Sequence, residues 1–215
     1  MGFEILNGNK MKSDELKKFL KKVCDEFKKE LKTGYEEIKE NPLYYRERTL
    51  SSYFFPVLMR LSKRALMEVH FKKEIEEEQK STDRHADFYV LSKTYDTSYI
   101  IEFKQVWHDA GYSNQKVGER WKEVNDQLND LNKDNVKQID IGKKIYGISF
   151  LVMTTINKKN KTSKECKEEL EFIMSNDLSE AHWSYTWKVS GDIKEGFEEA
   201  KFEYVTFIGQ IKKLL

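Results

Sequence analysis

Two runs of sequence decide the fold: ADFYVL at residues 86–91 and YIIEFKQVW at residues 99–107. Both runs are rich in the β-branched and aromatic residues that favour strands, and the polar residues 93–98 between them suit a hairpin connection. We therefore predict two adjacent antiparallel strands. Each strand carries charge at a position where a buried strand normally has none, at Asp87 in the first and at Glu102 in the second.

Further helix-like and strand-like segments lie on both sides of this hairpin. Apolar residues recur at three- and four-residue steps over residues 13–40, which predicts an amphipathic helix that Asn41-Pro42 ends. Residues 145–153 are almost continuously apolar, as in a strand buried on both faces. The predicted elements are helices over 13–40, 44–64, 114–134 and 165–175, a strand beginning near 65, strands over 86–91, 99–107, 145–153 and 182–189, and a short element from 202.

This order of elements predicts a single α/β domain with a mixed central sheet flanked by helices. Residues 1–43 are expected to form an N-terminal helical segment packed on the core, and residues 44–215 to form the α/β domain. The helix over 13–40 either caps the domain or pairs with a second protomer to form a homodimer, and both alternatives remain open.

Composition limits the classes of protein to which the chain can belong. Its 38 basic and 37 acidic residues give a net charge of +1, which excludes a globally basic nucleic-acid-binding protein but allows a local basic face. The two cysteines, Cys24 and Cys166, lie far apart and do not form a disulfide framework, so we expect a reduced, cytoplasmic setting. No apolar run is long enough to span a membrane, and the charged first twenty residues are unlike a signal peptide, so no membrane partner is expected.

The charged residues of the hairpin form the most informative group. Alternate side chains of a strand share a face, so Glu102 and Lys104 point the same way, and a hairpin brings Asp87 beside them. Two neighbouring carboxylates repel each other unless a positive charge lies between them. Hard oxygen ligands suit Mg²⁺ or Mn²⁺, and a lysine beside such an ion can orient a water molecule or stabilise charge on a phosphate.

Asp87, followed by Glu102-Phe103-Lys104 on the next strand, resembles the PD-(D/E)xK nuclease superfamily, the restriction-endonuclease-like proteins. The resemblance implies an α-β-β-β-α-β core, which corresponds to residues 44–155, about half of the chain. Ala86 stands where that motif carries its proline, a position at which the superfamily varies.

The resemblance also implies an activity and a cofactor. It implies a metal-dependent endonuclease that hydrolyses phosphodiester bonds, with DNA favoured over RNA as the substrate. Asp87, Glu102 and the carbonyl of Phe103 are then the expected ligands of Mg²⁺ (or Mn²⁺), and Lys104 is the residue expected to position the attacking water.

Two further catalytic residues are implied by the resemblance, a glutamate from the first core helix and a glutamine after the lysine strand. Glu47 is the first choice for the glutamate and Glu68 the second. Gln127 is preferred to Gln115 for the glutamine. The expected nucleic-acid-binding residues are Arg84, Lys158, Lys159 and Lys161.

In an alternative interpretation, the protein has the same fold but no catalytic activity. Triplets of the form Glu-x-Lys are common in a chain so rich in charge, and Glu26-Phe27-Lys28 is one inside a predicted helix. Glu102 and Lys104 would then form an ordinary salt bridge on a strand. The protein would be a catalytically inactive nuclease-like module that binds nucleic acid or another protein.

Overall fold

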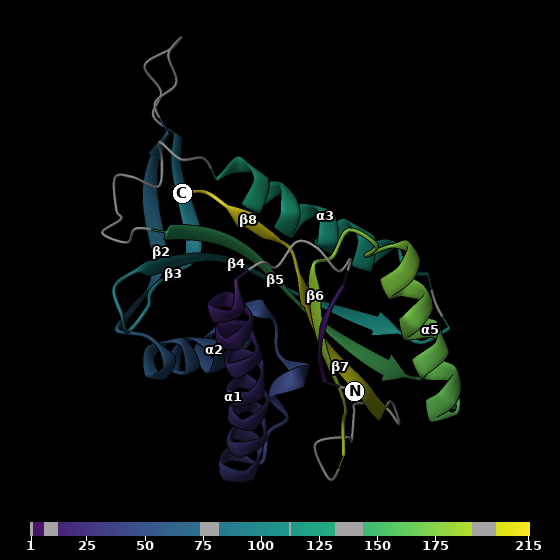
Figure 1. Cartoon of the computed structure of the whole chain (residues 1–215). Coiled ribbons are helices and arrows are strands. Elements are labelled where there is room, and N and C mark those ends of the chain that lie inside the picture. Colours follow the sequence, from purple (N-terminus) through teal and green to yellow (C-terminus); the bar gives the residue numbers. More distant parts are fainter. Residues whose placement is uncertain (1, 7–12, 74–81, 112, 132–143, 191–200) are drawn as a thin grey trace.

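Eight strands form one mixed sheet at the centre of the molecule (Figure 1). In this computed structural model, which describes residues 2–6, 13–73, 82–111, 113–131, 144–190 and 201–215, the strand order is β1-β6-β7-β5-β4-β3-β2, with β8 also paired to β5. β4 and β5 are parallel, and the other neighbouring strands are antiparallel. The strands are β1 (Phe3–Ile5), β2 (Arg64–Lys73), β3 (Thr82–Leu91), β4 (Thr97–Asp109), β5 (Lys144–Asn157), β6 (Trp183–Lys188), β7 (Lys201–Gly209) and β8 (Ile211–Lys213).

Helices cover both faces of this sheet, α1 and α2 on one face and α3 and α5 on the other (Figure 1). They are α1 (Asp14–Ile38), α2 (Glu47–Leu61), α3 (Gln115–Asp130) and α5 (Ser163–Asn176), with a 3-10 turn η1 (Pro42–Tyr44) before α2. Ser13 caps α1 by accepting a hydrogen bond from the Leu16 amide, and Thr162 forms a capping box with Glu165 at the start of α5. Local sequence signals therefore set both helix starts.

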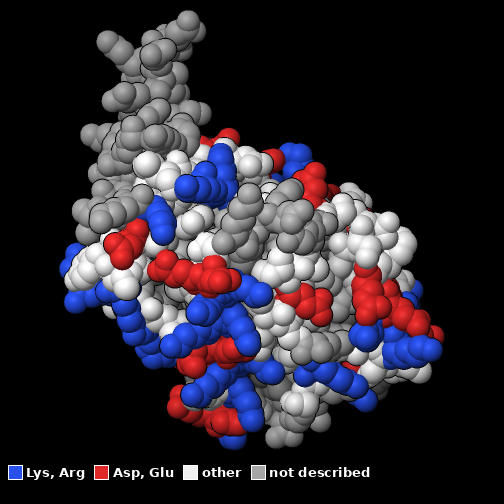
Figure 2. Space-filling model, viewed as in Figure 1, with Lys and Arg blue, Asp and Glu red and all other residues white. Residues whose placement is uncertain are grey.

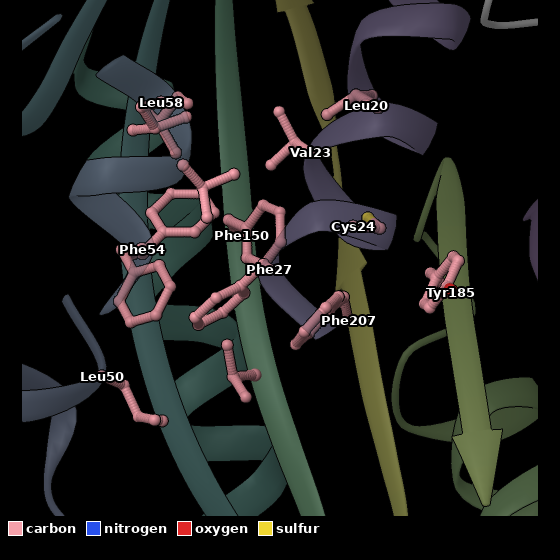
Figure 3. Close-up of a cluster of buried hydrophobic side chains, with 14 of the residues drawn as sticks. Leu20, Val23, Cys24, Phe27, Leu50, Phe54, Leu58, Phe150, Tyr185 and Phe207 are labelled. Carbon is pink, nitrogen blue, oxygen red and sulfur yellow. The ribbon is translucent and has the colours of Figure 1, made fainter. Parts of the chain in front are cut away.

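The main hydrophobic core lies between the sheet and the pair α1 and α2. Phe27 of α1 contacts Phe54 of α2 at 4.9 Å between ring centroids and stacks on Phe207 of β7 at 5.1 Å. Phe54 in turn lies 4.8 Å from Phe150 of the central strand β5. Figure 3 shows these rings meeting from both helices and from the sheet, so the N-terminal helix contributes to the same core as the strands.

The predicted elements are present with shifted ends, and two parts of the sheet differ from the prediction. The short strand β1, which pairs with β6, is not predicted because three residues are too few to show a period. The last segment is not one short element but two strands, β7 and β8, both paired to β5. Gly209, the last residue of β7, lets the chain pass close to β5 before β8 begins, since a Cβ at this position would lie 1.9 Å from the backbone oxygen of Ser149.

The structure bears on two expectations from the sequence, those about a membrane and about the cysteines. Within the described ranges, no helix combines the length and the apolar character needed to cross a membrane. Cys24 and Cys166 are both buried free thiols. Burial raises the pKa of both thiols above its ordinary value, so neither is disposed to form a thiolate.

Candidate functional site

The sheet splits between β3 and β4. The two strands pair from Leu91↔Ser98 to Phe88↔Ile101, and the ladder then stops. β4 nevertheless continues as far as Asp109, paired along its whole length to β5. From Glu102 onward, one edge of β4 therefore has no strand partner among the residues that the structure describes. Exposed backbone donors at such an edge are available to side chains or to a ligand.

Asp87 turns its carboxylate into this split. Its Oδ2 accepts a hydrogen bond of 2.7 Å from the backbone amide of Phe103, in place of a bond between the two strands. The regular alternation of β3 is broken at the same point, because Ala86 lies in the buried cluster of Tyr89 and Leu91 rather than in that of Phe88. A strictly regular strand would place Asp87 on one face of the sheet instead of at the edge.

A strained residue lies opposite Asp87. The register of β2 and β3, with Met67↔Phe88 and Val69↔Ala86, places Glu68 across from Asp87. Glu68 has a φ of 50°, in the left-handed region that a non-glycine residue adopts at a cost of about 1–3 kcal/mol. The irregularity that turns Asp87 into the split thus involves both strands. Glu68 itself is exposed.

Glu102 and Lys104 lie on the α3 side of β4 and are both buried, at 3% and 6% exposure. Burial of charged groups is expensive unless they are paired. The Nζ of Lys104 lies 3.2 Å from Oε1 of Glu47, in the first turn of α2. The structure therefore brings Lys104 to Glu47, the first choice for the additional glutamate, whereas Glu68 lies on the other side of Asp87.

A cleft of about 1020 Å³ surrounds the free edge of β4. One wall is the start of α2, and the other is the first half of α3. Its lining residues are Arg46, Glu47, Gln105, Val106, Trp107, Asp109, Ser113, Gln115, Lys116, Glu119, Arg120 and Glu123. Glu47, the partner of Lys104, forms part of the cleft wall, whereas Asp87, Glu102 and Lys104 themselves are not among its lining residues.

The cleft contains cations that sequence reasoning missed. Arg46 and Lys116 line its two walls, and neither side chain has an ion-pair partner among the described residues. Arg120, also in the lining, pairs with Glu123. The only sequence signals are that Arg46 precedes Glu47 and that Lys116 follows Gln115, and adjacency to a predicted site residue is a weak signal.

Glutamine side chains contribute unsatisfied polar atoms close to this cleft. Gln105 lines it, and its Nε2 is buried without a hydrogen-bond partner in the described part of the chain. The Oε1 of Gln127 is likewise buried and unpartnered. Gln127 is outside the lining but follows Lys116, Arg120 and Glu123 on one ridge of α3. Gln115, the alternative to Gln127, lines the cleft and hydrogen-bonds to Glu119 at 2.8 Å.

The expected nucleic-acid-binding lysines lie on the loop after β5, and each makes an intramolecular contact. Lys158 lies 3.1 Å from Asp109, Lys159 donates to the carbonyl of Gly111 at 2.8 Å, and Lys161 lies 2.6 Å from Glu169. These contacts tie the loop to the end of β4, beside the cleft residue Asp109. Arg84 belongs to β3, and its side chain lies outside the described residues.

A buried histidine lies at the same end of β4. The Nε2 of His108 is 3.2 Å from Oε1 of Glu169, a distance for an ion pair but without the alignment of a good hydrogen bond. Burial lowers the pKa of His108, an effect that the neighbouring Glu169 carboxylate partly offsets. Burial alone would raise the pKa of Glu169, but its hydrogen bonds from Lys161 and Gly111 lower that pKa below the ordinary value. Glu169 thus connects α5 to the ends of β4 and β5.

The donor atoms at the split are those that a hard divalent cation prefers. Asp87 and Glu102 supply carboxylate oxygens from positions that would face each other if the β3–β4 register continued, and Phe103 adds a backbone carbonyl. In the described ranges, no three His, Cys, Asp or Glu side chains lie close enough together to hold a metal ion. Mg²⁺, however, keeps several waters and binds through one or two carboxylates, so the donor set fits it.

Comparison of the chain with protein-family models, with curated proteins and with solved structures gives no match.

Proposed function

We propose that the protein is a Mg²⁺-dependent nuclease that hydrolyses phosphodiester bonds, in DNA rather than RNA. The observation that carries the proposal is the position of the Asp87 carboxylate in the split between β3 and β4. It accepts a hydrogen bond from the backbone amide of Phe103, the residue between Glu102 and Lys104. The order α2-β2-β3-β4-α3-β5 supports it, because this is the core order that the PD-(D/E)xK resemblance implies. The split lies on the second and third strands of that core.

Asp87, Glu102 and the carbonyl of Phe103 would hold the metal ion. Bound there, Mg²⁺ supplies a lowered pKa for a coordinated water and a positive charge opposite the reacting phosphate. The carboxylates alone would repel a phosphodiester, so activity is expected to require the metal. The hydrogen bond from Phe103 fixes Oδ2 of Asp87, and the other carboxylate oxygen would be the one that binds a metal ion.

Lys104 and Glu47 would supply the remaining chemistry. The Lys104 ammonium has three donors, of which Glu47 uses one at 3.2 Å. The other donors can hold the attacking water and a phosphate oxygen, which places the reactants and stabilises charge that develops during attack. Glu47 is the residue that keeps Lys104 in place, since it is the ion-pair partner of this buried lysine among the residues that the structure describes.

The cleft would receive the nucleic-acid strand. Arg46 and Lys116 provide cations on its two walls, and Arg guanidinium groups bind phosphate oxygens in a bidentate manner. Glu119, Glu123 and Asp109 also line the cleft, so its charge is mixed. We therefore expect modest affinity without metal and tighter binding when a divalent ion neutralises the carboxylates.

One observation favours a second candidate, a non-catalytic nuclease-like module. Asp87 and Lys104 both have intramolecular partners, as structural residues do. In that case the site would hold neither metal nor substrate, and the protein would act through binding to nucleic acid or to another protein.

Cleavage of supercoiled plasmid DNA tests the proposal. The wild-type protein is expected to nick or cut the plasmid in Mg²⁺ or Mn²⁺ and to leave it intact in EDTA. Lys104→Met should lower the rate by about 10²-fold or more, because a charge that stabilises the transition state is lost. The matched control is Lys93→Met, which removes an exposed lysine of the β3–β4 hairpin and should cleave at the wild-type rate.

Three outcomes of the cleavage experiment would contradict or correct the proposal. Equal cleavage by wild-type and Lys104→Met proteins would assign the activity to another site or to a contaminant. If plasmid, linear and single-stranded DNA all remain intact in both metals, the proposal of a DNA nuclease is wrong. Metal-dependent cleavage of RNA alone would correct the substrate and retain the chemistry.

A further inference from the structure

The outer surface of α1 carries an unusual density of unpaired lysines. We call this surface the α1 lysine face, and it comprises Lys17, Lys18, Lys21, Lys22, Lys28, Lys29 and Lys32, all exposed. Figure 2 shows blue side chains gathered over the position of α1, with some acidic side chains among them. Of the seven lysines, Lys32 alone has an ion-pair partner among the described residues, Glu36 at 3.6 Å.

Charges on α1 are segregated around the helix. At 3.6 residues per turn, the lysines fall on the outer surface and on one flank of the apolar stripe, whereas Glu15, Glu26, Glu30 and Glu37 fall on the other flank. The acidic flank faces α2, because Glu30 pairs with Arg60 there. The basic flank faces β6, because Lys28 lies over the ring of Trp187 at 5.7 Å.

The α1 lysine face contains seven lysines and three acidic residues, Asp14, Asp25 and Glu36, so it keeps an excess of positive charge. Like charges at i and i+4 destabilise a helix by about 0.2–0.5 kcal/mol per pair, and Lys17–Lys21, Lys18–Lys22 and Lys28–Lys32 are three such pairs. Asp14–Lys18, Lys21–Asp25 and Asp25–Lys29 have opposite charges at the same spacing and offset part of this repulsion. A polyanion outside the chain would bind the positive charge that remains.

We propose that the α1 lysine face binds the phosphate backbone of double-stranded nucleic acid. From Lys17 to Lys32 the helix rises about 22 Å at 1.5 Å per residue, the axial length of six or seven phosphates of one strand at about 3.4 Å each. Lysines bind phosphates as point charges, so the contact is independent of base sequence. No residue of α1 lines the cleft at β4, and the surface is thus a second contact, separate from the proposed reaction site.

A membrane is the less suitable polyanion for this surface. A basic helix that binds a bilayer inserts its apolar face among the acyl chains. The apolar face of α1 is committed to the core, since Leu20, Phe27 and Leu31 are at most 1% exposed. The lysines are therefore available for charge contacts only, and a rigid, regular row of phosphates matches a rigid row of cations.

Binding of a fluorescein-labelled duplex DNA, measured by fluorescence anisotropy in EDTA over a range of salt concentrations, tests the proposal. The triple variant Lys18→Gln, Lys22→Gln, Lys29→Gln removes three unpaired lysines and keeps good helix formers. The slope of log K against log salt should decrease by about 0.9 for each lysine that contacts a phosphate. The matched control is Lys93→Gln, Lys164→Gln, Lys167→Gln, which removes the same charge from other exposed surfaces and should keep the wild-type slope.

Equal slopes for the α1 variant and the control would overturn the proposal. So would an α1 variant that binds the duplex normally but loses affinity for phosphatidylserine vesicles, since that result assigns the face to a membrane. The test is independent of cleavage because it is made without metal. The nuclease proposal is tested separately, by metal-dependent cleavage, and the α1 variant keeps Asp87, Glu102 and Lys104, so failure of one proposal is distinguishable from failure of the other.

Discussion

At the scale of the residue, the pair of Lys104 and Glu47 is the most consequential contact. The Lys104 side chain is 8% exposed and the Glu47 side chain 36% exposed. Removing one partner of a fully buried pair costs about 3–5 kcal/mol, and solvent around Glu47 must reduce that figure. An apolar side chain in place of Lys104 removes the buried charge and leaves Glu47, which is partly exposed and can be solvated, so this substitution leaves no charge fully buried and unpaired.

These energies give a prediction that separates stability from activity. Glu47→Ala, which removes the ion-pair partner of the buried Lys104, is expected to lower the free energy of unfolding by about 1–2 kcal/mol. Lys104→Met is expected to leave that free energy unchanged or to raise it, while lowering the cleavage rate by about 10²-fold or more. Urea unfolding of both variants measures the difference. A larger loss for Lys104→Met than for Glu47→Ala would mean that the pair serves mainly to hold α2 against β4.

Glu68 gives a second prediction at this scale, from its φ of 50° opposite Asp87. Glycine adopts that conformation without steric cost, whereas alanine keeps the strain. Glu68→Gly should therefore be more stable than Glu68→Ala by about 1 kcal/mol in thermal or urea unfolding. If alanine is equally stable or more stable, the backbone at Glu68 is regular, and the irregularity that turns Asp87 into the split has another origin.

At the scale of the element, the sequence predicted those parts of the fold whose residues show a period or a clear composition. The charged positions Asp87, Glu102 and Lys104 stand out because most of the other residues in 86–91 and 99–107 are apolar. The split itself was not predictable, since a stop in the ladder after Phe88↔Ile101 depends on β2 and on the backbone of Glu68. The cleft cation Arg46 also escaped prediction because its place depends on how α2 meets the sheet.

His108, at the end of β4, contacts Glu169 of α5. Because His108 can take up a proton, the stability of this contact depends on pH. Burial keeps the pKa of His108 below its ordinary value of about 6.5. The imidazole therefore binds a proton more readily in the unfolded chain than in the folded protein. The stability contributed by neutral His108 is present above pH 6.5 and is lost as the pH falls from there through the lowered pKa.

The measurement is the melting temperature at pH 7.5 and pH 5.5. The wild-type protein is expected to lose melting temperature on acidification, and His108→Gln, which has no titrating group at this position, should lose less. The other histidines are the same in both proteins and cancel in the comparison. An identical loss in the two proteins would show that His108 does not resist protonation in the folded state.

At the scale of the whole molecule, the balance of 38 basic and 37 acidic residues hides a separation of charge. Carboxylates lie at the split, at Asp87 and Glu102, and the cleft lining has mixed charge, whereas lysines outnumber acidic residues on the outer surface of α1. Figure 2 shows the basic side chains over α1. A net charge near zero is therefore compatible with a polyanionic partner, provided that a divalent ion neutralises the carboxylates.

Metal binding by the intact protein discriminates a nuclease from a non-catalytic module. A ligand at one hundred times its Kd stabilises the folded state by about 2.7 kcal/mol, so Mn²⁺ is expected to raise the melting temperature. Asp87→Asn should abolish that increase, and Asp96→Asn, at an exposed aspartate of the β3–β4 hairpin, should preserve it. A melting temperature indifferent to Mn²⁺ in the wild-type protein would favour the non-catalytic module.

The central claim is that the split between β3 and β4 is a metal site, and a crystal structure of the protein soaked in MnCl₂ tests it most directly. The measurement is the anomalous difference map. We predict a manganese peak coordinated by Asp87, Glu102 and the carbonyl of Phe103, with Lys104 beside it. A map without a peak in the split, or with manganese bound only elsewhere, would contradict the claim.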